Sequence, residues 1–435
     1  MKPKVAICWL RRDLRLDDNA AMYHALKNHE LVLPLFIFDK NILDKLSDKE
    51  DKRVLFIHQE ISALSEKLKK EFSASLIVKY STPLEAWKEL CTEFEIEAVY
   101  ANHDYESYGI NRDSDIKSLL EEKEIAFKTF KDHVVFEKNE VVKDDGLPYT
   151  VFTPYSKKWS AKLNADYYKS YPTLEYANHF YKTDSFKIPS LAQMGFKEIE
   201  FAFPDKVAKG NVIEKYTEQR NFPAINGTSH LGIHLRFGTL SVRKLLAYAL
   251  KKNQTFVNEL IWRDFYQQIL FHFPHVEKNA FRPAYDLIEW ENNEKHYELW
   301  CEGKTGYPLV DAGMRELNTT GFMHNRVRMV VASFLTKHLL IDWRWGEAYF
   351  AEKLLDFDLA ANNGGWQWAA GSGTDAAPYF RIFNPTAQQQ KFDPEFKYIK
   401  KWVPEFGTHE YCSPIVNHEE ARKKCLSVYQ KALKP

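Results

Sequence analysis

The strongest constraint on the fold is a change of pattern along the chain. Over the first 130 residues, short apolar runs alternate with stretches of helical periodicity. Strands are expected at residues 5–10, 31–38, 76–79, 98–101 and 126–130, and helices between them at 19–28, 52–72, 83–94 and 110–123. Strands that alternate with helices predict βαβ units, and therefore a doubly wound, Rossmann-like parallel α/β domain over residues 1–130.

The rest of the chain has a different character. Residues 131–203 show weak periodicity with many Tyr, Lys and Pro residues. They predict an interdomain connector that crosses the surface of the second domain and contains short helices. From residue 204 to residue 435 the pattern is helical, with Ser241 and Thr255 as expected N-caps and helices over 315–317, 326–340 and 345–357. This part predicts an all-α domain.

Composition excludes several classes of protein. The 435 residues carry no net charge, which argues against a generally basic nucleic-acid binder but allows a local basic patch. Five scattered cysteines without a C-x-x-C pair are typical of a cytoplasmic protein. No apolar run is long enough to span a membrane. The absence of G-x-G-x-x-G, Walker, H-E-x-x-H and G-x-S-x-G motifs argues against dinucleotide, NTPase, metal and hydrolase sites, so no metal is expected.

Residues 321–394 combine side chains that an ordinary core would not select. Four tryptophans, two carboxylates, two amides and two glycines stand close together: Trp343, Trp345, Trp366, Trp368, Asp356, Asp358, Asn362, Asn363, Gly364 and Gly365. A charge in an apolar setting is costly unless it is paired, so the two aspartates predict arginine partners or the polar edge of a ligand. Aromatic planes, fixed charges and glycines that admit a close ligand together favour a large planar cofactor.

Two further segments carry candidate binding residues. The glycine- and hydroxyl-rich loop Asn226–Gly232 can hold a phosphate, although it can equally be a helix-capping loop. In NELIWRDFY, Glu259 and Arg263 stand four residues apart with Trp262 beside them. Such a group is either an exposed ion pair or a surface that hydrogen-bonds and stacks on a nucleobase.

The segment GFMHNRVRM supplies the arginine partner that the aspartates require. Arg326 and Arg328 do not share a helix face, so one is expected to point inward toward Asp356 or Asp358. Lys337, Arg344 and Arg381 add positive charge, which predicts a local phosphate-binding surface. Seven of the eleven tryptophans lie between Trp262 and Trp368. These tryptophans either fill the hydrophobic core or, if they are closely spaced, form an electron relay.

On these motifs the chain resembles the photolyase/cryptochrome family, and most closely a microbial, class I type cyclobutane pyrimidine dimer photolyase. The resemblance extends over nearly the full length, from WLRRDLRLDDNAA through NGTSHL, NELIWRDFY and GFMHNRVRM to DFDLAANNGGWQWAAGSGTDAAPYFRIFNP. It implies an antenna domain, then a helical domain that binds FAD and DNA. The implied reaction is light-driven repair, in which excited FADH⁻ donates an electron to a dimer flipped out of the DNA.

The resemblance also implies the roles of individual residues. The flavin would be held by Tyr216, Thr228, Ser229, His230, Leu231, Gly232, Phe256, Arg328, Asp356, Phe357, Asp358 and Asn362, with Arg328 paired to Asp356 and Asn362 facing the flavin N5. Trp366, Trp343 and Trp290 would form the electron relay, in that order outward, which leaves Trp345 as a structural residue. Damaged DNA would be met by Arg220, Glu259, Trp262, Arg263, Tyr266, Asn325, Arg326, Met329 and Trp368, with Glu259 as a catalytic group.

Some positions depart from the family pattern or narrow its function. Gly232 and Phe322 stand where relatives often have serine and tryptophan, and the Asn-Glu pair of folate-binding members is missing around residues 102–109. A second, antenna chromophore therefore remains possible but unidentified. Asn325 and Met329 replace the two histidines of relatives that repair (6-4) photoproducts, which favours the cyclobutane dimer. The alternative is a cryptochrome-type blue-light receptor, including the DASH type that prefers single-stranded DNA. A monomer is expected.

Overall fold

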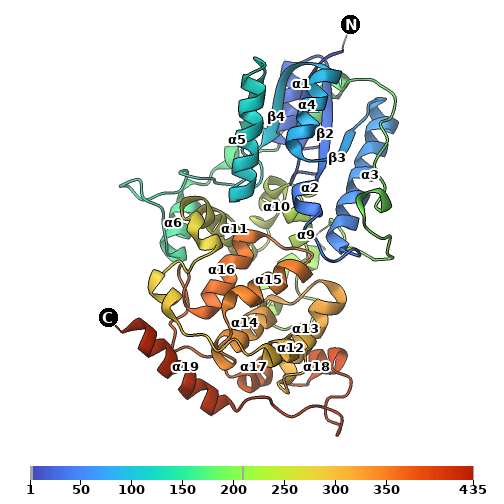
Figure 1. Cartoon of the computed structure of the whole chain (residues 1–435). Coiled ribbons are helices and arrows are strands. Elements are labelled where there is room, and N and C mark those ends of the chain that lie inside the picture. Colours follow the sequence, from blue (N-terminus) through green and yellow to red (C-terminus); the bar gives the residue numbers. More distant parts are fainter. Residues whose placement is uncertain (1–2, 208–209, 435) are drawn as a thin grey trace. The chain divides into compact units, whose positions relative to one another are not determined.

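The chain divides into two compact units in a computed structural model that describes residues 3–207 and 210–434 (Figure 1). The first unit comprises Met1–Glu137, Leu163–Val207 and Leu231–Tyr248. The second comprises Lys138–Lys162, Ala208–His230 and Ala249–Pro435. Each unit is therefore assembled from segments that are separated in sequence.

The first unit is built on a parallel sheet of five strands in the order β3-β2-β1-β4-β5. The strands are β1 (Lys4–Leu10), β2 (Val32–Asp39), β3 (Ile77–Ser81), β4 (Glu95–Asn102) and β5 (Ala126–Phe130). The helices between them are α1 (Ala20–Asn28), α2 (Lys40–Leu43), α3 (Lys52–Phe72), α4 (Pro83–Glu93) and α5 (Ser107–Glu121). This is the predicted doubly wound α/β fold, and its winding reverses between β1 and β4.

Burial on both faces of the sheet explains why its inner strands β1 and β2 read as continuous apolar runs. In β1, Ala6, Cys8 and Leu10 belong to the core on one face of the sheet. Val5, Ile7 and Trp9 alternate with them and belong to the core on the other face. The helices that cover these faces begin at well-formed caps; the Thr82 hydroxyl, for example, accepts a hydrogen bond from Glu85 N.

The segment predicted as a connector contains the short helices that were expected, namely α6 (Phe152–Lys162), η1 (Ala165–Tyr168), η2 (Thr173–His179) and η3 (Ala192–Met194). Within this segment, residues 131–137 and 163–203 belong to the first unit, and residues 138–162 belong to the second. Phe180, Leu191 and Met194 are buried in the core beneath the sheet, and Phe180 forms a bridge with Val32. Scattered apolar side chains in a weakly periodic segment anchor it there.

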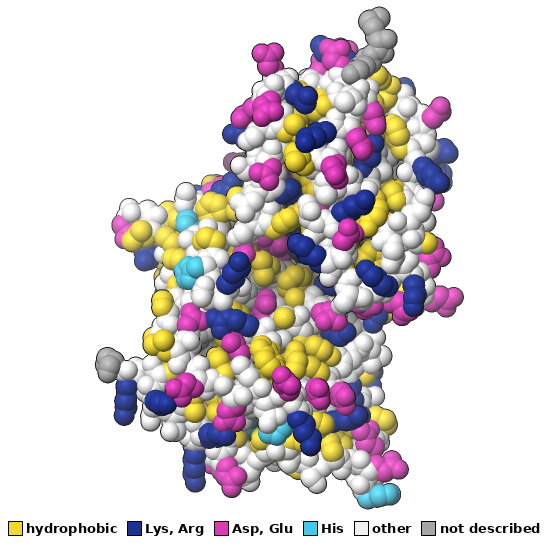
Figure 2. Space-filling model, in the orientation of Figure 1, with side chains coloured by type: hydrophobic (Ala, Val, Ile, Leu, Met, Phe, Trp, Pro, Cys, Tyr) yellow, Lys and Arg dark blue, Asp and Glu magenta, His cyan; other side chains and the backbone are white. Residues whose placement is uncertain are grey.

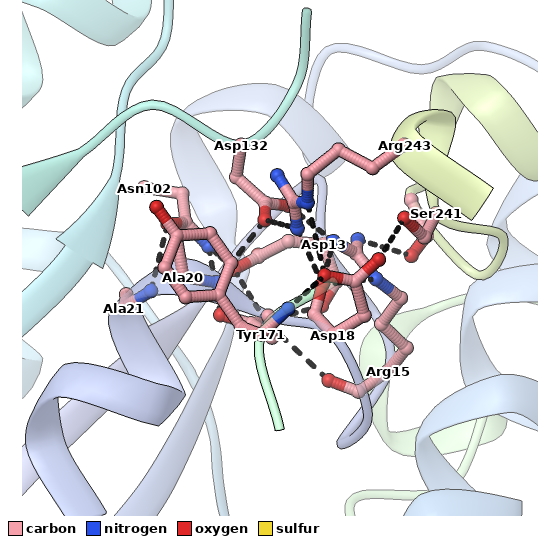
Figure 3. Close-up of polar contacts among 12 residues, drawn as sticks. Asp13, Arg15, Asp18, Ala20, Ala21, Asn102, Asp132, Tyr171, Ser241 and Arg243 are labelled. Atoms are coloured by element: carbon pink, nitrogen blue, oxygen red, sulfur yellow. Dashed lines mark hydrogen bonds and ion pairs between the residues drawn. The ribbon is translucent and has the colours of Figure 1, made fainter. Parts of the chain in front are cut away.

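A buried ion network ties the loop after β1 to α10 (Val242–Ala249) within the first unit (Figure 3). Arg243 donates from Nε to Asp18 at 2.9 Å and from Nη2 to Asp132 at 2.7 Å. Arg15 donates to the other Asp132 oxygen at 2.6 Å. Burial acts to raise the pKa of Asp132, but the two guanidinium groups outweigh it and lower that pKa to about 2. The Ser241 hydroxyl accepts from Lys244 N, as expected of an N-cap.

Helices build the second unit, as predicted, and all the named strands of the described chain lie in the first. Besides α6, these helices are α7 (Gly210–Glu214), α8 (Tyr216–Gln219), α11 (Gln254–His272), α12 (Glu294–Glu302), α13 (Pro308–Thr320), α14 (Asn325–Ser333), α15 (Trp343–Lys353), α16 (Leu359–Ala370), α17 (Pro385–Phe392), α18 (Lys397–Trp402) and α19 (His418–Leu433). Short turns η4 (Pro274–Glu277) and η5 (Pro283–Leu287) join α11 to α12, and α9 (Gly232–Arg236) belongs to the first unit.

Two expectations about helix ends need correction. The cap of α11 is Asn253, whose side chain accepts from Phe256 N at 3.1 Å, and not Thr255. The Thr255 hydroxyl is engaged instead with Thr217 at 2.8 Å. The helix expected over 326–340 is α14 followed by a π-helical turn, η6 (Phe334–His338). Tertiary contacts decide both features, so the local sequence does not reveal them.

The surface agrees with the absence of net charge. On the face that Figure 2 shows, acidic and basic side chains are interspersed over each unit rather than gathered by sign. In the part of the chain that the structure describes, no helix combines the length and apolar character needed to cross a membrane.

Candidate functional site

The two aspartates that the sequence singled out have partners in the second unit. Arg328 on α14 donates from Nη2 to both carboxylate oxygens of Asp356, at 3.1 and 3.0 Å. Its Nε donates to the Met323 carbonyl at 2.7 Å, which fixes the plane of the guanidinium group. Asp358 caps α16 and accepts from Gln267 Nε2 at 2.9 Å. The pairing of Arg328 with Asp356 is the one predicted.

Asn362, on the first turn of α16, is oriented by α15. Its Nδ2 donates to the Glu347 backbone carbonyl at 3.1 Å and to Glu347 Oε1 at 3.0 Å. A backbone carbonyl can only accept, so the amide nitrogen must face Glu347 and the amide oxygen must point elsewhere. Burial raises the pKa of Glu347 to about 7, while the bond from Asn362 acts to lower it. The site thus presents a fixed hydrogen-bond acceptor.

The glycine pair after Asn363 has two different roles. A Cβ on Gly364 would lie 2.2 Å from the ring of Tyr266, so this glycine allows α16 to pack tightly against α11. A Cβ on Gly365 would meet nothing within 4 Å. The expectation that these glycines admit a close ligand therefore fits Gly365, whereas Gly364 is explained by helix packing.

The residues around the aspartates suit a large polar and planar group. Within the described chain, two buried atoms near them have no partner: Gln267 Oε1 and His324 Nε2. His324 Nδ1 accepts from Arg326 N at the start of α14, so the proton must sit on Nε2, which is then a donor. Gln267 Oε1 is thus a free acceptor and His324 Nε2 a free donor, and both carboxylates are already paired. The polar edges of a flavin dinucleotide require hydrogen-bonding groups of this kind.

The remaining predicted flavin residues lie on several elements. Tyr216 and Phe256 are in ring contact at 5.2 Å, and Phe357 packs against the helical core. The phosphate loop is split: Thr228, Ser229 and His230 belong to the second unit, and Leu231 and Gly232 to the first. The His230 ring lies 4.1 Å from that of Phe322, and burial lowers its pKa. His230 is therefore expected to be neutral near pH 7.

The three predicted relay tryptophans are associated with one core. Trp366 and Trp343 are each 2% exposed and belong to the same buried cluster of the second unit, and Trp290 packs against it. Trp290 is also half-buried and in edge contact with Tyr429 at 6.0 Å. Gly346 on α15 leaves room for the Trp366 ring, since a Cβ there would lie 2.1 Å from it. Trp345 contacts Tyr297 at 5.2 Å.

Glu259 is held by a residue far away in sequence. Arg220 Nη1 forms an ion pair with Glu259 Oε1, and each side chain is 33% exposed. Arg220 also lies over the Tyr216 ring at 5.7 Å. Burial raises the pKa of Glu259, and Arg220 acts in the opposite direction. The partner of Glu259 could not be read from the sequence, which suggested Arg263 on the same helix.

Trp262 has a neighbour that sequence reasoning missed. The Phe152 ring is stacked on the indole, with centroids 3.7 Å apart and planes within 3°. Phe265 and Tyr266 lie at 5.6 and 5.4 Å. The Phe152 amide donates to Asp375 at 3.2 Å, which anchors the aromatic support. Phe152 is 110 positions from Trp262, and no local signal links the two.

The other predicted DNA-facing residues surround the start of α14 and the end of α16. Arg326 donates to Asn221 Oδ1 at 2.7 Å and lies 4.5 Å above the Phe392 ring. Asn325 is exposed, whereas Arg263, Met329 and Trp368 are half-buried. The Trp368 ring lies 6.4 Å from that of Phe383. Among the described residues, no group of three or more His, Cys, Asp or Glu side chains could hold a metal ion.

Comparison with known proteins assigns this arrangement to a family. Residues 6–175 match a family model described as DNA photolyase, and residues 256–410 match one described as the FAD binding domain of DNA photolyase. The deoxyribodipyrimidine photo-lyase of Escherichia coli is 36% identical over 98% of this chain and 99% of its own length. The chain belongs to the DNA photolyase family. It is thus an FAD-dependent enzyme of DNA repair, as the sequence predicted.

Solved structures agree with this assignment. A class III photolyase from Agrobacterium tumefaciens superimposes with a TM-score of 0.87 at 30% identity, over 100% of this photolyase and 99% of that chain. An archaeal photolyase from Sulfolobus tokodaii, whose structure holds two FAD molecules, gives 0.84 at 36% identity, over 98% and 100%. A Synechocystis cryptochrome also gives 0.84, but at 24% identity it supports the fold alone.

Proposed function

We propose that this photolyase repairs cyclobutane pyrimidine dimers in DNA. The proposal rests mainly on the geometry around the contact of Gly364 with Tyr266. Trp368 follows Gly364 by four residues and Trp262 precedes Tyr266 by four, so each tryptophan lies one helical turn from this contact, on the same face as the contacting residue. Two indoles near one helix contact are suited to receive a flipped-out pyrimidine dimer, which stacks poorly in the duplex.

In this proposal, Glu259 and Arg220 act on the polar edge of the dimer. Glu259 stands one turn before Trp262 on α11, where its carboxyl group would hydrogen-bond the base edge of the dimer. Arg220, paired with Glu259, adds positive charge. Both effects would stabilise the negative charge that the dimer carries after it gains one electron and its ring opens.

FAD, when bound, supplies the light-excited electron donor. Asp356, Asp358 and Asn362 would hold its polar edges, together with the loop Thr228–Gly232 and the other residues assigned by resemblance. Asn362 would orient its amide oxygen toward the flavin, because its amide nitrogen faces Glu347. Trp366, Trp343 and Trp290 would deliver electrons from the surface when the bound flavin is oxidised. Arg326, Arg263, Asn325, Met329 and Trp368 would complete the surface for damaged DNA.

The antenna domain is proposed over residues 1–130, the connector over residues 131–203 and the catalytic domain over residues 204–435; residues 163–207 and 231–248 belong to the same compact unit as the antenna domain. At the carboxyl ends of β1 and β4 the antenna domain has a small polar cavity, lined by residues such as Arg11, Arg12 and Asp104. Arg12 is already paired with Asp104 and Glu106. This cavity does not identify the antenna. The absorption spectrum of the purified protein tests for one, since a band beyond those of flavin reveals it.

The deciding experiment is repair of an oligonucleotide that contains a single thymine dimer. Protein loaded with reduced FAD is expected to restore the thymines under blue light, to leave them dimerised in the dark, and to leave a (6-4) oligonucleotide unrepaired. Intact cyclobutane dimers after illumination would reject the proposal and favour a cryptochrome-type receptor. Repair restricted to single-stranded DNA would favour the DASH type. We expect the protein to be a monomer, and sedimentation of the same sample measures its oligomeric state.

A further inference from the structure

The π-helical turn η6 extends α14, which carries Arg326 and Met329 on its first turns. Single π-turns inside α-helices frequently occur at functional sites. Here the turn contains two buried titratable side chains, Lys337 and His338. His338 is engaged with His418 of α19, with Nε2 and Nδ1 2.8 Å apart. Lys337 has no part in the mechanism above, so its position needs a separate explanation.

Lys337 is not a phosphate-binding residue, contrary to the expectation from sequence. It is 1% exposed and therefore cannot reach DNA. Its Nζ donates to the backbone carbonyl of Arg381 at 3.0 Å. Burial lowers the pKa of Lys337 to about 8; the charged and titratable groups around it are Arg381, Cys425 and His338. A buried ammonium whose partner is a neutral carbonyl is a costly arrangement, because the carbonyl offsets less of the desolvation than a carboxylate would.

The carbonyl that Lys337 binds belongs to the loop between α16 and α17, residues 378–384. Arg381 N donates to Pro378 O at 2.8 Å, which closes a turn. Phe380 at the tip is 61% exposed, and Arg381 is exposed with its guanidinium 5.7 Å from the Phe383 ring. Phe383 in turn lies beside Trp368. The loop therefore presents an aromatic ring and a cation next to one of the two indoles proposed to receive the dimer.

Arg381 belongs to the same positive surface as two residues already proposed to bind DNA. Burial lowers the pKa of Arg326, and the positive charges of Arg220 and Arg381 lower it further. Three like charges that influence one another repel, so a free loop would tend to move Arg381 away from Arg326. A bond to the Arg381 backbone counters this tendency and leaves the guanidinium free to contact a phosphate.

We propose that Lys337 is a positioning residue for damaged DNA, which holds the 378–384 loop in place through the Arg381 carbonyl. The inference rests on the proposed DNA surface around Trp262, Trp368 and Arg326. Since η6 continues α14, the bond ties the loop to the helix that carries Arg326. Ordering the loop before DNA arrives reduces the entropy lost on binding, and this gain appears as affinity for the lesion.

The test compares Lys337→Met with Lys337→Arg in the full-length, FAD-loaded protein. Methionine retains the volume but loses the donor, and a buried charge replaced by an apolar side chain need not destabilise the fold. We expect K337M to keep its FAD and its melting temperature, and to bind a duplex containing one thymine dimer about tenfold more weakly, or about 1.4 kcal/mol. Trypsin should cleave after Arg381 faster in K337M than in the wild type. K337R should restore both properties.

Control variants distinguish a failure of the positioning role of Lys337 from a failure of the proposed DNA-binding surface. Lys353→Met removes a cation from α15, where Lys353 pairs with Glu352, and should change neither the affinity nor the cleavage rate. If K337M binds and is cleaved like the wild type while R326A and R381A bind poorly, the positioning role is wrong and the surface stands. If R326A and R381A bind normally, the surface itself is wrong. Should K337M not fold, Lys337→Gln serves instead, because its amide is too short to reach the carbonyl; normal lesion affinity in K337Q then overturns the proposal.

Discussion

The side-chain amide of Asn362 is locked onto Glu347 by two hydrogen bonds, one to the backbone carbonyl and one to the carboxyl group. These bonds join the first turn of α16 to α15. They place the amide oxygen of Asn362, and not its nitrogen, on the side proposed to face the flavin. An acceptor at that point favours a flavin whose facing nitrogen carries a proton, which is the reduced form that repair requires.

Glu347 should make stability depend on pH. Its folded pKa of about 7 lies above the value of about 4.3 in an unfolded chain, so the folded protein binds this proton more tightly. The contribution is fully present below about pH 4 and is lost as the pH rises to about 7. The free energy of unfolding of the Glu347→Gln variant should therefore rise relative to that of the wild type as the pH increases from 5 to 8. Urea unfolding of both proteins at several pH values measures this difference. An identical pH slope in both proteins contradicts this prediction.

Arg328 should be needed to retain FAD. Arg328→Ala leaves Asp356 without its partner beside the proposed flavin site, and we expect the dissociation constant of FAD to rise about tenfold. Arg328→Lys should give an intermediate value, because lysine keeps the charge and loses the planar fork. The matched control is Arg315→Ala, since Arg315 pairs with Glu405 at similar exposure elsewhere in the unit. Flavin fluorescence measures the dissociation constant of FAD for all three variants. If Arg315→Ala weakens FAD binding as much as Arg328→Ala does, the effect of Arg328 is not local to the flavin site.

Trp290 should be required for photoreduction but not for repair. Trp290→Phe removes the outermost member of the proposed relay and keeps an aromatic ring in contact with Tyr429. We expect oxidised FAD to remain oxidised under blue light with an external reductant, while chemically reduced enzyme repairs dimers at nearly the wild-type rate. Trp345→Phe is the control, because Trp345 packs on Tyr297 and is not assigned to the relay. Parallel loss of both activities in W290F would argue against the relay.

Arg326 should contact a phosphate. Arg326→Ala is expected to weaken binding to damaged and undamaged duplexes, and to reduce the slope of log K against log salt by about 0.9. The exposed Arg422 on α19 offers a control with the same loss of charge. If R326A and R422A have the same salt slope, Arg326 does not belong to the phosphate surface.

Much of the fold was predictable because burial acts on local pattern. The strands β1 and β2 are covered on both faces of the parallel sheet, so they read as unbroken apolar runs bounded by turns. The pair Arg328–Asp356 was also predictable, since a charge in an apolar segment demands an opposite charge. The helix α16 was harder, because Asn-Asn-Gly-Gly has low helix propensity and is held helical by packing against Tyr266.

What the sequence could not supply are contacts between distant segments. Glu259 forms an ion pair with Arg220, which lies outside α11, and Phe152 supports Trp262 from a segment 110 residues earlier. Lys337 looked like a surface cation, yet it is buried because a π-turn, which has no sequence signature, directs it inward. Each of these depends on which segments the fold brings together, and periodicity carries no such information.

Substitutions of Gly364 and Gly365 should distinguish a glycine needed for helix packing from one needed for ligand binding. Gly364→Ala should destabilise the protein by about 1–3 kcal/mol, because its Cβ would overlap the Tyr266 ring. Gly365→Ala meets no atom and should stabilise the FAD-free protein by up to about 1 kcal/mol, as alanine does in helices. If Gly365 faces the flavin, the same substitution should nevertheless lower the FAD content. Urea unfolding and flavin absorbance together distinguish the two effects, and normal FAD content in G365A would place Gly365 outside the cofactor site.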